Sequence, residues 1–405
     1  GAVGPLCWPQ PPGPPAPMRP GSRAVHAGRE IGAHEPLGPA IFQTSVYVYD
    51  DLDDYDTVAG GERPGHVYAR NSNENVAMLE TAIADLEGAP AAVATGSGMA
   101  ALLVAILALS PRPAPLVAPL DLYGGTSALL RRDLEPLGYG VRVADFGDLP
   151  ALERLLDGAG LVLCETITNP LSRVADLAAV CRLAGRAAVP VLVDNTFATP
   201  ILSRPLELGA AAVVHSATKY IGGHSDLVAG VVAGGTEAMS AARGRAGRLG
   251  TTLGPFEAWL ALRGLRTLAL RMARVSESSL ELASRLEGAP GVAAVHHPLL
   301  AGNPDREIAA RLLPRGAGGM FAFQLGGGRE AAERLQSRLR MVRFAASLGG
   351  VETTVSYPEI TSHRSLSPEQ RSALGVTGGT VRVSTGIEDP ADIVEDFLGA
   401  LEAGA

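Results

Sequence analysis

One lysine stands out among the side chains that could carry out chemistry. Lys219 is the only lysine in the 405 residues, although lysine and arginine together number 34. Arginine can replace lysine on a solvated surface, but it stays protonated and cannot act as an amine nucleophile. A lysine that is kept in such a composition is either a surface remnant or a candidate for forming a Schiff base with a carbonyl compound.

The neighbours of Lys219 favour the chemical interpretation. Lys219 lies in the segment Ser216–Asp226, which follows the apolar run Ala210–Val214. The apolar run predicts a buried strand. The amine therefore lies at the end of that strand, where hydroxyls and glycines leave room for a ligand.

Other apolar runs are also followed by residues suited to ligand binding. Asp194 ends the run Val189–Val193, Gly98 and Met99 begin a predicted helix, and Tyr123 follows a predicted strand. Each has a simpler explanation by itself. Asp194 could cap a helix or turn, the glycine-rich segment before Met99 could form an ordinary turn and helix start, and Tyr123 could be a half-buried core residue.

Taken together, these residues meet the demands that pyridoxal phosphate makes of a protein. The amine of Lys219 would hold the aldehyde, and the carboxylate of Asp194 would pair with the pyridinium nitrogen. The start of the predicted helix and the hydroxyls of Ser216 and Thr218 would bind the phosphate, because helix N-termini bind anions. The ring of Tyr123 would cover the pyridine ring. The sequence therefore predicts pyridoxal 5′-phosphate as the cofactor.

Short apolar runs alternate with helix-length segments through the middle of the chain. Helices are predicted at Val76–Leu86 and Ser97–Leu109. The predicted strands are Ala91–Ala94, Leu116–Pro119, Val141–Val143, Leu161–Glu165, Val189–Asp194, Ala211–His215 and Leu227–Ala233. This alternation predicts an α/β fold with a mainly parallel sheet covered by helices, and such sheets bind ligands at the carboxyl ends of their strands.

The pattern changes near residue 255 and predicts a second domain. Phe256–Arg285 reads as one or two long helices, and strands are predicted at Gly291–His296, Gly319–Leu325 and Thr380–Ser384. We therefore expect a smaller α+β domain at 256–405 after a large domain at 76–255. An arm at 21–75 precedes them, and a disordered, proline-rich segment at 1–20 precedes the arm.

Composition excludes several classes of partner. The net charge of −8 argues against a nucleic-acid or anionic membrane surface. The longest apolar run, Met99–Leu109, is too short to cross a bilayer. Cys7, Cys164 and Cys181 form neither a disulfide framework nor a metal pair, and the histidines show no metal-ligand spacing. We expect a cytoplasmic protein without a metal, a nucleic-acid partner or a membrane partner.

The ordered motifs of the chain resemble those of the transsulfuration enzymes, the pyridoxal-phosphate enzymes of Cys/Met metabolism. The resemblance covers about Thr44 to Leu398. Its segments are Tyr68–Arg70, Gly96–Met99, Tyr123–Gly124, Glu165 with Asn169, Asp194–Pro200, Ser216–Asp226, Arg263–Leu268, Ser347–Gly350, and Arg382 before Gly386. It implies a fold type I, aspartate aminotransferase-like architecture, a homotetramer of two catalytic dimers, and a small amino-acid substrate.

The resemblance also implies a role for each matching residue. Lys219 and Tyr123 would be catalytic. The cofactor would be held by Gly98, Met99, Tyr123, Asp194, Ser216, Thr218 and Lys219 of one subunit, with Tyr68 and Arg70 from the arm of its neighbour. The substrate would be held by Glu165, Asn169, Ser347 and Arg382. Arg382 would hold the α-carboxylate, since a planar guanidinium makes a bidentate pair with a carboxylate.

Two positions bear on the reaction. Methionine γ-lyases typically carry a reactive cysteine where this chain has Gly125, and cystathionine-handling members often carry a glutamate where it has Ala346. We expect γ-elimination or γ-replacement on an L-homoserine-type amino acid, in the manner of cystathionine γ-lyase. Cystathionine γ-synthase, an O-acylhomoserine thiol-lyase and a specialised γ-lyase are the alternatives, ahead of methionine γ-lyase and a non-catalytic pyridoxal-phosphate-binding protein. The choice depends on the pocket near Glu165, Ala346, Ser347, Tyr357 and His363.

Overall fold

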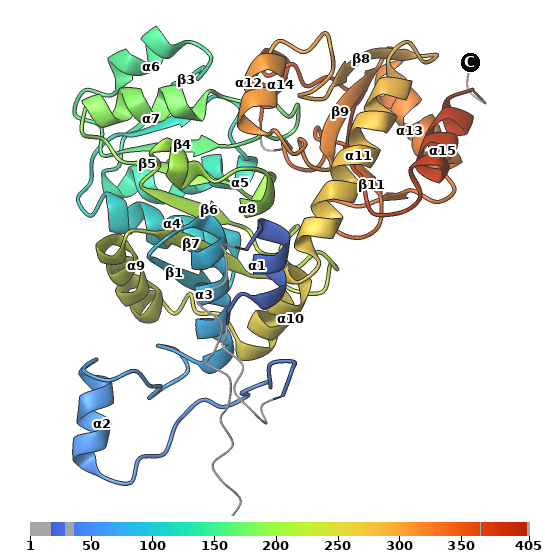
Figure 1. Cartoon of the computed structure of the whole chain (residues 1–405). Coiled ribbons are helices and arrows are strands. Elements are labelled where there is room, and N and C mark those ends of the chain that lie inside the picture. The colour runs from blue at the N-terminus through green and yellow to red at the C-terminus, as the bar shows by residue number, and fades with distance from the viewer. Residues whose placement is uncertain (1–17, 29–35, 365, 403–405) are drawn as a thin grey trace, which may run out of the picture.

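Two β-sheets organise the chain, and the computed structural model describes residues 18–28, 36–364 and 366–402. The seven-stranded sheet lies at the left of Figure 1 and the five-stranded sheet at the right. Residues 1–17 of the predicted disordered segment lie outside the described residues. Pro20, which that prediction included, is instead the first residue of helix α1 (Pro20–His26), because the fixed φ of proline suits the first helical turn.

The larger sheet is the mainly parallel sheet that the sequence predicted. Its strands lie in the order β1 (Ala91–Thr95), β7 (Gly230–Gly234), β6 (Ala212–His215), β5 (Val191–Asp194), β4 (Leu161–Glu165), β2 (Leu116–Pro119) and β3 (Val141–Ala144). Only β7 runs against its neighbours. The prediction began β7 too early, at Leu227, because the residues before Gly230 hydrogen-bond to the loop that carries Lys219.

Helices cover both faces of this sheet. On one face, α4 (Gly98–Leu109) and α9 (Thr236–Leu249) share an apolar cluster with most of the strands. On the other, α3 (Glu74–Glu87) and α10 (Pro255–Leu265) cover β1 and β7, while α6 (Leu149–Leu155) and α7 (Leu177–Arg186) cover β2 to β5. Helix α4 is apolar on nearly all sides because it lies between the sheet and α9.

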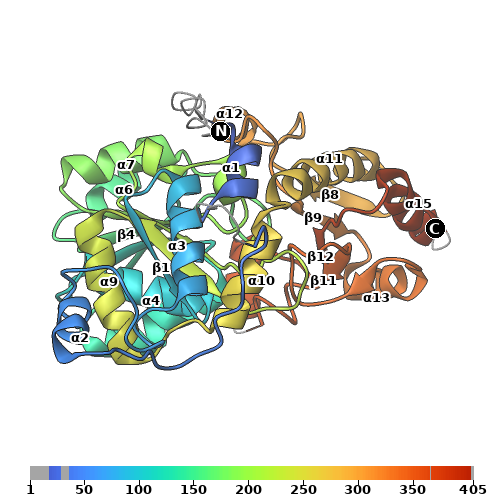
Figure 2. The same cartoon turned by 60° about the horizontal axis from the view of Figure 1, so that its bottom comes forward.

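The second sheet forms the smaller α+β domain. Its order is β10 (Arg343–Phe344), β11 (Thr354–Ser356), β12 (Thr380–Ser384), β9 (Met320–Leu325) and β8 (Val292–His296). Helices α11 (Leu268–Leu286), α13 (Gly328–Arg338) and α15 (Pro390–Glu402) pack with it around one core. Figures 1 and 2 show α11 leading from the large domain into this one. The sequence did not predict β10 and β11, which are too short to produce a periodic pattern.

Short helices complete the chain, and one of them lies on an extended segment. They are α2 (Leu52–Ala59), α5 (Gly124–Ala128), α8 (Thr199–Leu202), α12 (Arg306–Leu312) and α14 (Pro368–Ala373). The segment that carries α2 extends away from the two domains (Figure 1). Several of its apolar residues are open to solvent, with Val48 94% and Leu52 86% exposed, whereas Val58 is buried.

A buried polar network ties three strand ends together on the side of the sheet that α3 covers. The hydroxyl of Thr166 donates to Oδ1 of Asn195 at 2.7 Å, and Nδ2 of Asn195 donates to Oε1 of Glu87 at 3.1 Å. The same carboxylate oxygen lies 2.6 Å from Nε2 of His215, and both of these side chains are fully buried. Thr166 and Asn195 follow β4 and β5 directly, and His215 ends β6. The network therefore holds the strand ends that lead into the region around Lys219.

Replacing Glu87 with alanine tests the contribution of this network to stability. The substitution leaves two buried groups, the imidazole of His215 and the amide of Asn195, without their shared acceptor. Leaving a buried donor without its acceptor typically costs about 1–3 kcal/mol. We therefore expect the free energy of unfolding of Glu87→Ala, measured by denaturant titration, to fall by that amount.

Asp85→Ala is the matched control on the same helix. It removes an ion pair with Arg23 in which the Asp85 side chain is 49% exposed, and such pairs contribute less than about 1 kcal/mol. Equal losses for the two variants would contradict the stabilising role of the network.

Candidate active site

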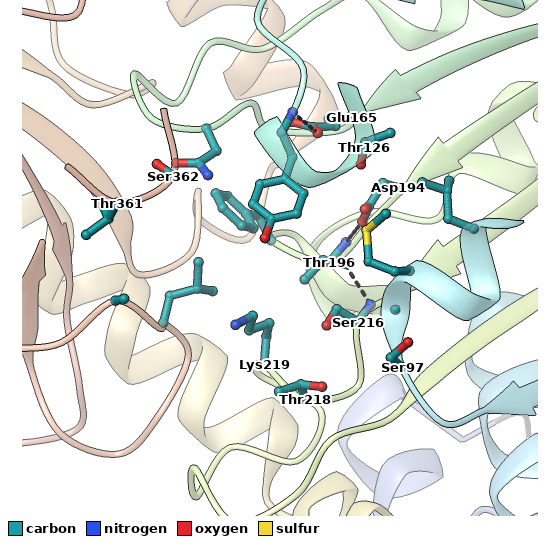
Figure 3. A pocket seen from close by; sticks show the side chains of 18 of the residues that line it. Ser97, Thr126, Glu165, Asp194, Thr196, Ser216, Thr218, Lys219, Thr361 and Ser362 are labelled. Atoms are coloured by element: carbon teal, nitrogen blue, oxygen red, sulfur yellow. Dashed lines mark hydrogen bonds between the residues drawn. The ribbon is translucent and has the colours of Figure 1, made fainter. Parts of the chain in front are cut away.

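A cavity of about 550 Å³ lies where the two domains meet. The large domain contributes residues that follow β1, β2 and β6 and residues at the ends of β4 and β5, while the smaller domain contributes Ala346, Leu348, Arg382 and residues 360–362. Figure 3 shows Ser216, Thr218 and Lys219 on one side of this space, with Thr361 and Ser362 across from them. The carboxyl edge of the parallel sheet thus forms one wall of the cavity.

Lys219 extends into the cavity from the loop after β6. Its Nζ donates a hydrogen bond to Oγ of Ser347 at 3.0 Å, so the bond joins the large domain to the smaller one. Burial, and then the positive charge of Arg382, lower the pKa of the Lys219 amine. A larger fraction of the amine is therefore neutral, and nucleophilic, at a given pH than for an exposed lysine.

A buried and a partly buried carboxyl group lie side by side in the cavity. Glu165 and Asp194 are paired residues of the neighbouring parallel strands β4 and β5. An Asp194 oxygen accepts the backbone N–H of Thr196 at 3.0 Å, and a Glu165 oxygen accepts that of Tyr123 at 2.8 Å. Burial raises the pKa of both groups, and the neighbouring Asp194 raises that of Glu165 further. A cationic group of a ligand, such as a pyridinium nitrogen, would favour ionisation here.

The start of α4 forms a recess suited to an anion. Ser97 caps the helix by accepting the N–H of Ala100 at 3.1 Å. A side chain on Gly98 would place its Cβ 2.7 Å from Cβ of Ser216, so only glycine leaves this recess open. Ser216 is held in turn, since its backbone N–H donates to Oγ1 of Thr196 at 2.8 Å. These features fit a phosphate at a helix N-terminus.

The hydroxyl of Thr218 already has protein partners. It donates to the carbonyl of Ala229 at 3.1 Å and accepts the N–H of the same residue at 3.0 Å. Thr218 therefore fastens the Lys219 loop to the chain before β7, and it has one acceptor position left for a ligand.

Arg382 brings a buried positive charge to the cavity. Its guanidinium donates to Oδ1 of Asn169 at 3.2 Å and to the carbonyls of Ala346 and Ser347 at 3.3 and 3.1 Å. Within the described ranges no carboxylate pairs with it, and its Nε has no partner. Burial lowers its pKa to about 10, which leaves it protonated at neutral pH. This arrangement fits the carboxylate of an amino acid.

The remaining predicted residues fall into two groups. Met99, Tyr123 and Asn169 line the cavity. Tyr68 and Arg70 lie outside the cavity of their own chain, where Arg70 donates to the carbonyl of Gly247 at 2.9 Å and stacks over the Tyr68 ring at 5.6 Å.

Sequence reasoning did not assign every residue of the cavity. Thr196 had a usable signal in the sequence, because it lies two residues after β5, and Ser216 likewise comes directly after β6. Residues 360–362 had none, since only the tertiary fold brings them to the site. Tyr357, expected near the pocket, instead donates its hydroxyl to the carbonyl of Ala332 and stacks on Phe344. His363, also expected near the pocket, does not line the cavity. Its side chain is fully buried, and this burial lowers its pKa to about 4.

The described part of the chain has neither a membrane-spanning helix nor a candidate metal site. No helix there is long and apolar enough to span a membrane. The His, Cys, Asp and Glu side chains of those residues form no group that could hold a metal ion.

Comparisons with known proteins agree with this geometry. Residues 21–402 match the family model described as Cys/Met metabolism PLP-dependent enzyme. The chain is 39% identical over 381 residues to an O-succinylhomoserine sulfhydrylase of Pseudomonas aeruginosa, covering 94% of each protein. It is 38% identical to an L-methionine γ-lyase of Pseudomonas putida, covering 95% of this chain and 97% of the relative.

A solved structure is similar over the same extent. Cystathionine γ-synthase from Xanthomonas oryzae pv. oryzae, in complex with cystathionine, superimposes with a TM-score of 0.90 and 36% identity. The likeness covers 96% of this chain and 100% of that one. The predicted fold class, the enzymatic nature of the protein and the cofactor are thereby confirmed. The chain belongs to the pyridoxal-phosphate-dependent enzymes of Cys/Met metabolism.

Proposed function

We propose that this enzyme catalyses γ-elimination or γ-replacement on an L-homoserine-type amino acid, in the manner of cystathionine γ-lyase. The observation that carries the proposal is the single lysine, whose amine lies in a cavity that also holds two neighbouring carboxyl groups and a guanidinium without a carboxylate partner among the described residues. Such a site combines a nucleophilic amine, a partner for a cationic ring and a partner for a carboxylate. The relatives described above act on sulfur-containing or homoserine-derived amino acids by their names.

The residues of the cavity divide the work of holding the cofactor. Lys219 would hold it covalently through the aldehyde, and Asp194 would face its ring nitrogen. The N-terminus of α4 and the hydroxyl of Ser216 would bind its phosphate, and Tyr123 would cover its ring. When bound, the cofactor would withdraw electrons from the substrate, which makes the proton on Cα and then a proton on Cβ removable.

Lys219 would also move protons once a substrate amine has replaced it. A leaving group at Cγ departs only after protons leave Cα and then Cβ, and the freed amine is placed to take both. Its lowered pKa favours the neutral form that accepts a proton. Arg382 and Asn169 would fix the substrate through its α-carboxylate, and Ser347 would orient the amine of Lys219 by the bond described above.

Elimination and replacement differ in whether a thiol adds at Cγ before the product leaves. The wall of the cavity near Ala346 and Leu348 is apolar, and Ile360 continues it. It offers no carboxylate to a distal ammonium such as that of cystathionine. We therefore place γ-elimination from a substrate with an uncharged γ-substituent first, and γ-replacement, as in cystathionine γ-synthase or O-acylhomoserine thiol-lyase, second.

We also propose that the active form is a homotetramer of two catalytic dimers. The segment around α2 exposes apolar side chains, and a contiguous exposed apolar surface marks an interaction site. Tyr68 and Arg70 lie on this segment and would complete the phosphate site of the neighbouring subunit. The cytoplasmic location stays a prediction, which rests on the lack of a disulfide framework among the three cysteines.

Substitution of Lys219 tests the chemistry directly. Lys219→Ala and Lys219→Arg should both lose the visible absorbance of covalently held pyridoxal phosphate, and turnover should fall by at least about 10²-fold, because a proton-transfer group is removed. The arginine variant keeps the positive charge, so it separates charge from amine chemistry. Arg274→Lys, which adds a lysine at an exposed position, is the control. Normal turnover in either Lys219 variant would refute the proposal.

A substrate panel distinguishes the reactions. The purified enzyme is mixed with L-cystathionine, O-acetyl- and O-succinyl-L-homoserine with and without cysteine, L-methionine, and γ-halogenated amino acids. We expect α-keto acid and ammonia without a thiol, which identifies a γ-lyase. A thioether formed only with cysteine would identify a synthase instead. No product across the panel would favour a protein that binds pyridoxal phosphate without catalysis.

Ala346→Glu tests the apolar wall within the same panel. A carboxylate here should raise kcat/KM for cystathionine about tenfold relative to a substrate with an apolar γ-substituent, since a hydrogen bond to a charged group contributes about 1.5–3 kcal/mol. Ala346→Gln adds similar bulk without the charge and serves as the control. An unchanged ratio in the glutamate variant would contradict this account of specificity.

Dilution tests the assembly. If Tyr68 and Arg70 complete a neighbour's phosphate site, cofactor affinity should fall as the protein dissociates, because each monomer then lacks part of that site. Sedimentation velocity with absorbance detection of bound cofactor measures both quantities together. A monomer with full activity and undiminished cofactor affinity would disprove the shared site.

A further inference from the structure

A buried arginine lies behind the Lys219 loop, outside the cavity. Arg271 is on α11 and is 5% exposed. Its guanidinium donates to the carbonyls of Tyr220, Ile221 and Gly264 at 2.5, 3.4 and 2.7 Å, and its Nε donates to Oγ1 of Thr267 at 3.1 Å. One side chain thus joins the turn after Lys219 to the junction of α10 and α11.

The charge of Arg271 has no carboxylate partner among the described residues. Burial lowers its pKa to about 10, so the group remains protonated at neutral pH, and its charge is met by three carbonyl dipoles and the hydroxyl of Thr267. Burying an ion costs free energy that carbonyls offset only in part. An apolar side chain of similar size would fill the same volume without that cost, so packing alone does not account for an arginine here.

The turn that Arg271 contacts is tightly fitted to it. Gly223 has a φ of +76°, and a side chain there would place its Cβ 2.2 Å from the guanidinium. Gly264 lies against the same turn, since its Cβ would be 2.1 Å from the carbonyl of Gly222. The turn begins at Lys219 itself, whose carbonyl accepts the N–H of Gly223 at 2.8 Å.

The smaller domain holds the opposite side of this turn. The hydroxyl of Tyr220 accepts the N–H of Gly319 at 3.2 Å. Gly349 packs on the backbone, where a Cβ would lie 2.8 Å from the nitrogen of Tyr220. With the carbonyl of Tyr220 held by Arg271, the residue next to Lys219 is fixed at its backbone and at its side chain.

We infer that Arg271 is a positioning residue, whose guanidinium holds the turn after Lys219 so that the amine is directed across the cavity toward Ser347. A planar fork with several donors can bind carbonyls of two chain segments at once, which a lysine or a neutral side chain cannot do. The inference rests on the proposed role of Lys219. It assigns a part of the active-site geometry to a residue that touches neither the cavity nor any group bound in it.

The single lysine makes the inference testable without activity. In cofactor-free protein, Lys219 is acylated with an amine reagent over a range of pH, and the extent at Lys219 is read by peptide mass spectrometry. Arg271→Met should shift the acylation profile to higher pH, because a loosened turn admits water and the pKa of the amine returns toward its ordinary value of 10.5. Arg274→Met, an exposed position one turn away, should leave the profile unchanged.

Two further readouts use the same variants. The rate at which pyridoxal phosphate attaches to Lys219, followed by absorbance, and kcat should both fall about 100-fold in Arg271→Met, the effect expected for a displacement of about 1 Å. The KM for the amino acid should change much less, since Arg382 is untouched. Arg271→Lys keeps the charge and the fold but not the fork, so it should change in the same direction.

An acylation profile and attachment rate in Arg271→Met that equal those of the wild type would overturn the inference. If that variant does not fold, unchanged values in Arg271→Lys would overturn it equally. A wild-type protein that attaches the cofactor but converts no substrate refutes the proposed function and leaves the positioning role standing, so the two failures are distinguishable.

Discussion

The alternation of side chains along parallel strands is the constraint on which the site depends. Successive residues of a strand point to opposite faces, and the carboxyl ends of parallel strands meet at one edge. At the ends of β4 and β5, Glu165 and Asp194 therefore enter the cavity, while Thr166 and Asn195 join the polar network beneath. A shift of register by one residue would exchange the two sets, so the network and the cavity specify each other.

The smaller domain turns this edge into an enclosed site. It places the buried guanidinium of Arg382 in the same cavity as the carboxyls at the ends of β4 and β5. It also adds the apolar wall formed by Ala346, Leu348 and Ile360. Acidic and basic groups thus share a region of low polarity, where a ligand that carries a positive and a negative charge can pair with both. Burial in this region disfavours the charged form of each group. It therefore lowers the pKa of the Lys219 amine and raises the pKa of the two carboxyls.

Much of this architecture was predictable from the sequence, because it rests on local patterns. Apolar runs located each strand of the larger sheet, and the motif residues after those runs gather in one cavity as expected. Residues 360–362 and Arg271 were not recognisable, since their positions follow from contacts between distant segments. The short strands β10 and β11 and the orientation of Tyr357 depend on the packing of the second core in the same way.

The hydrogen bond between Lys219 and Ser347 joins the large domain to the smaller one, which has a thermodynamic consequence. A ligand that binds both sides of the cavity adds its binding free energy to the interface between the domains. This binding free energy couples the two domains more tightly in heat denaturation, which favours one cooperative transition over separate steps. The cooperativity of melting then depends on whether the site is occupied, and it reports on the contact between the domains without any measurement of catalysis.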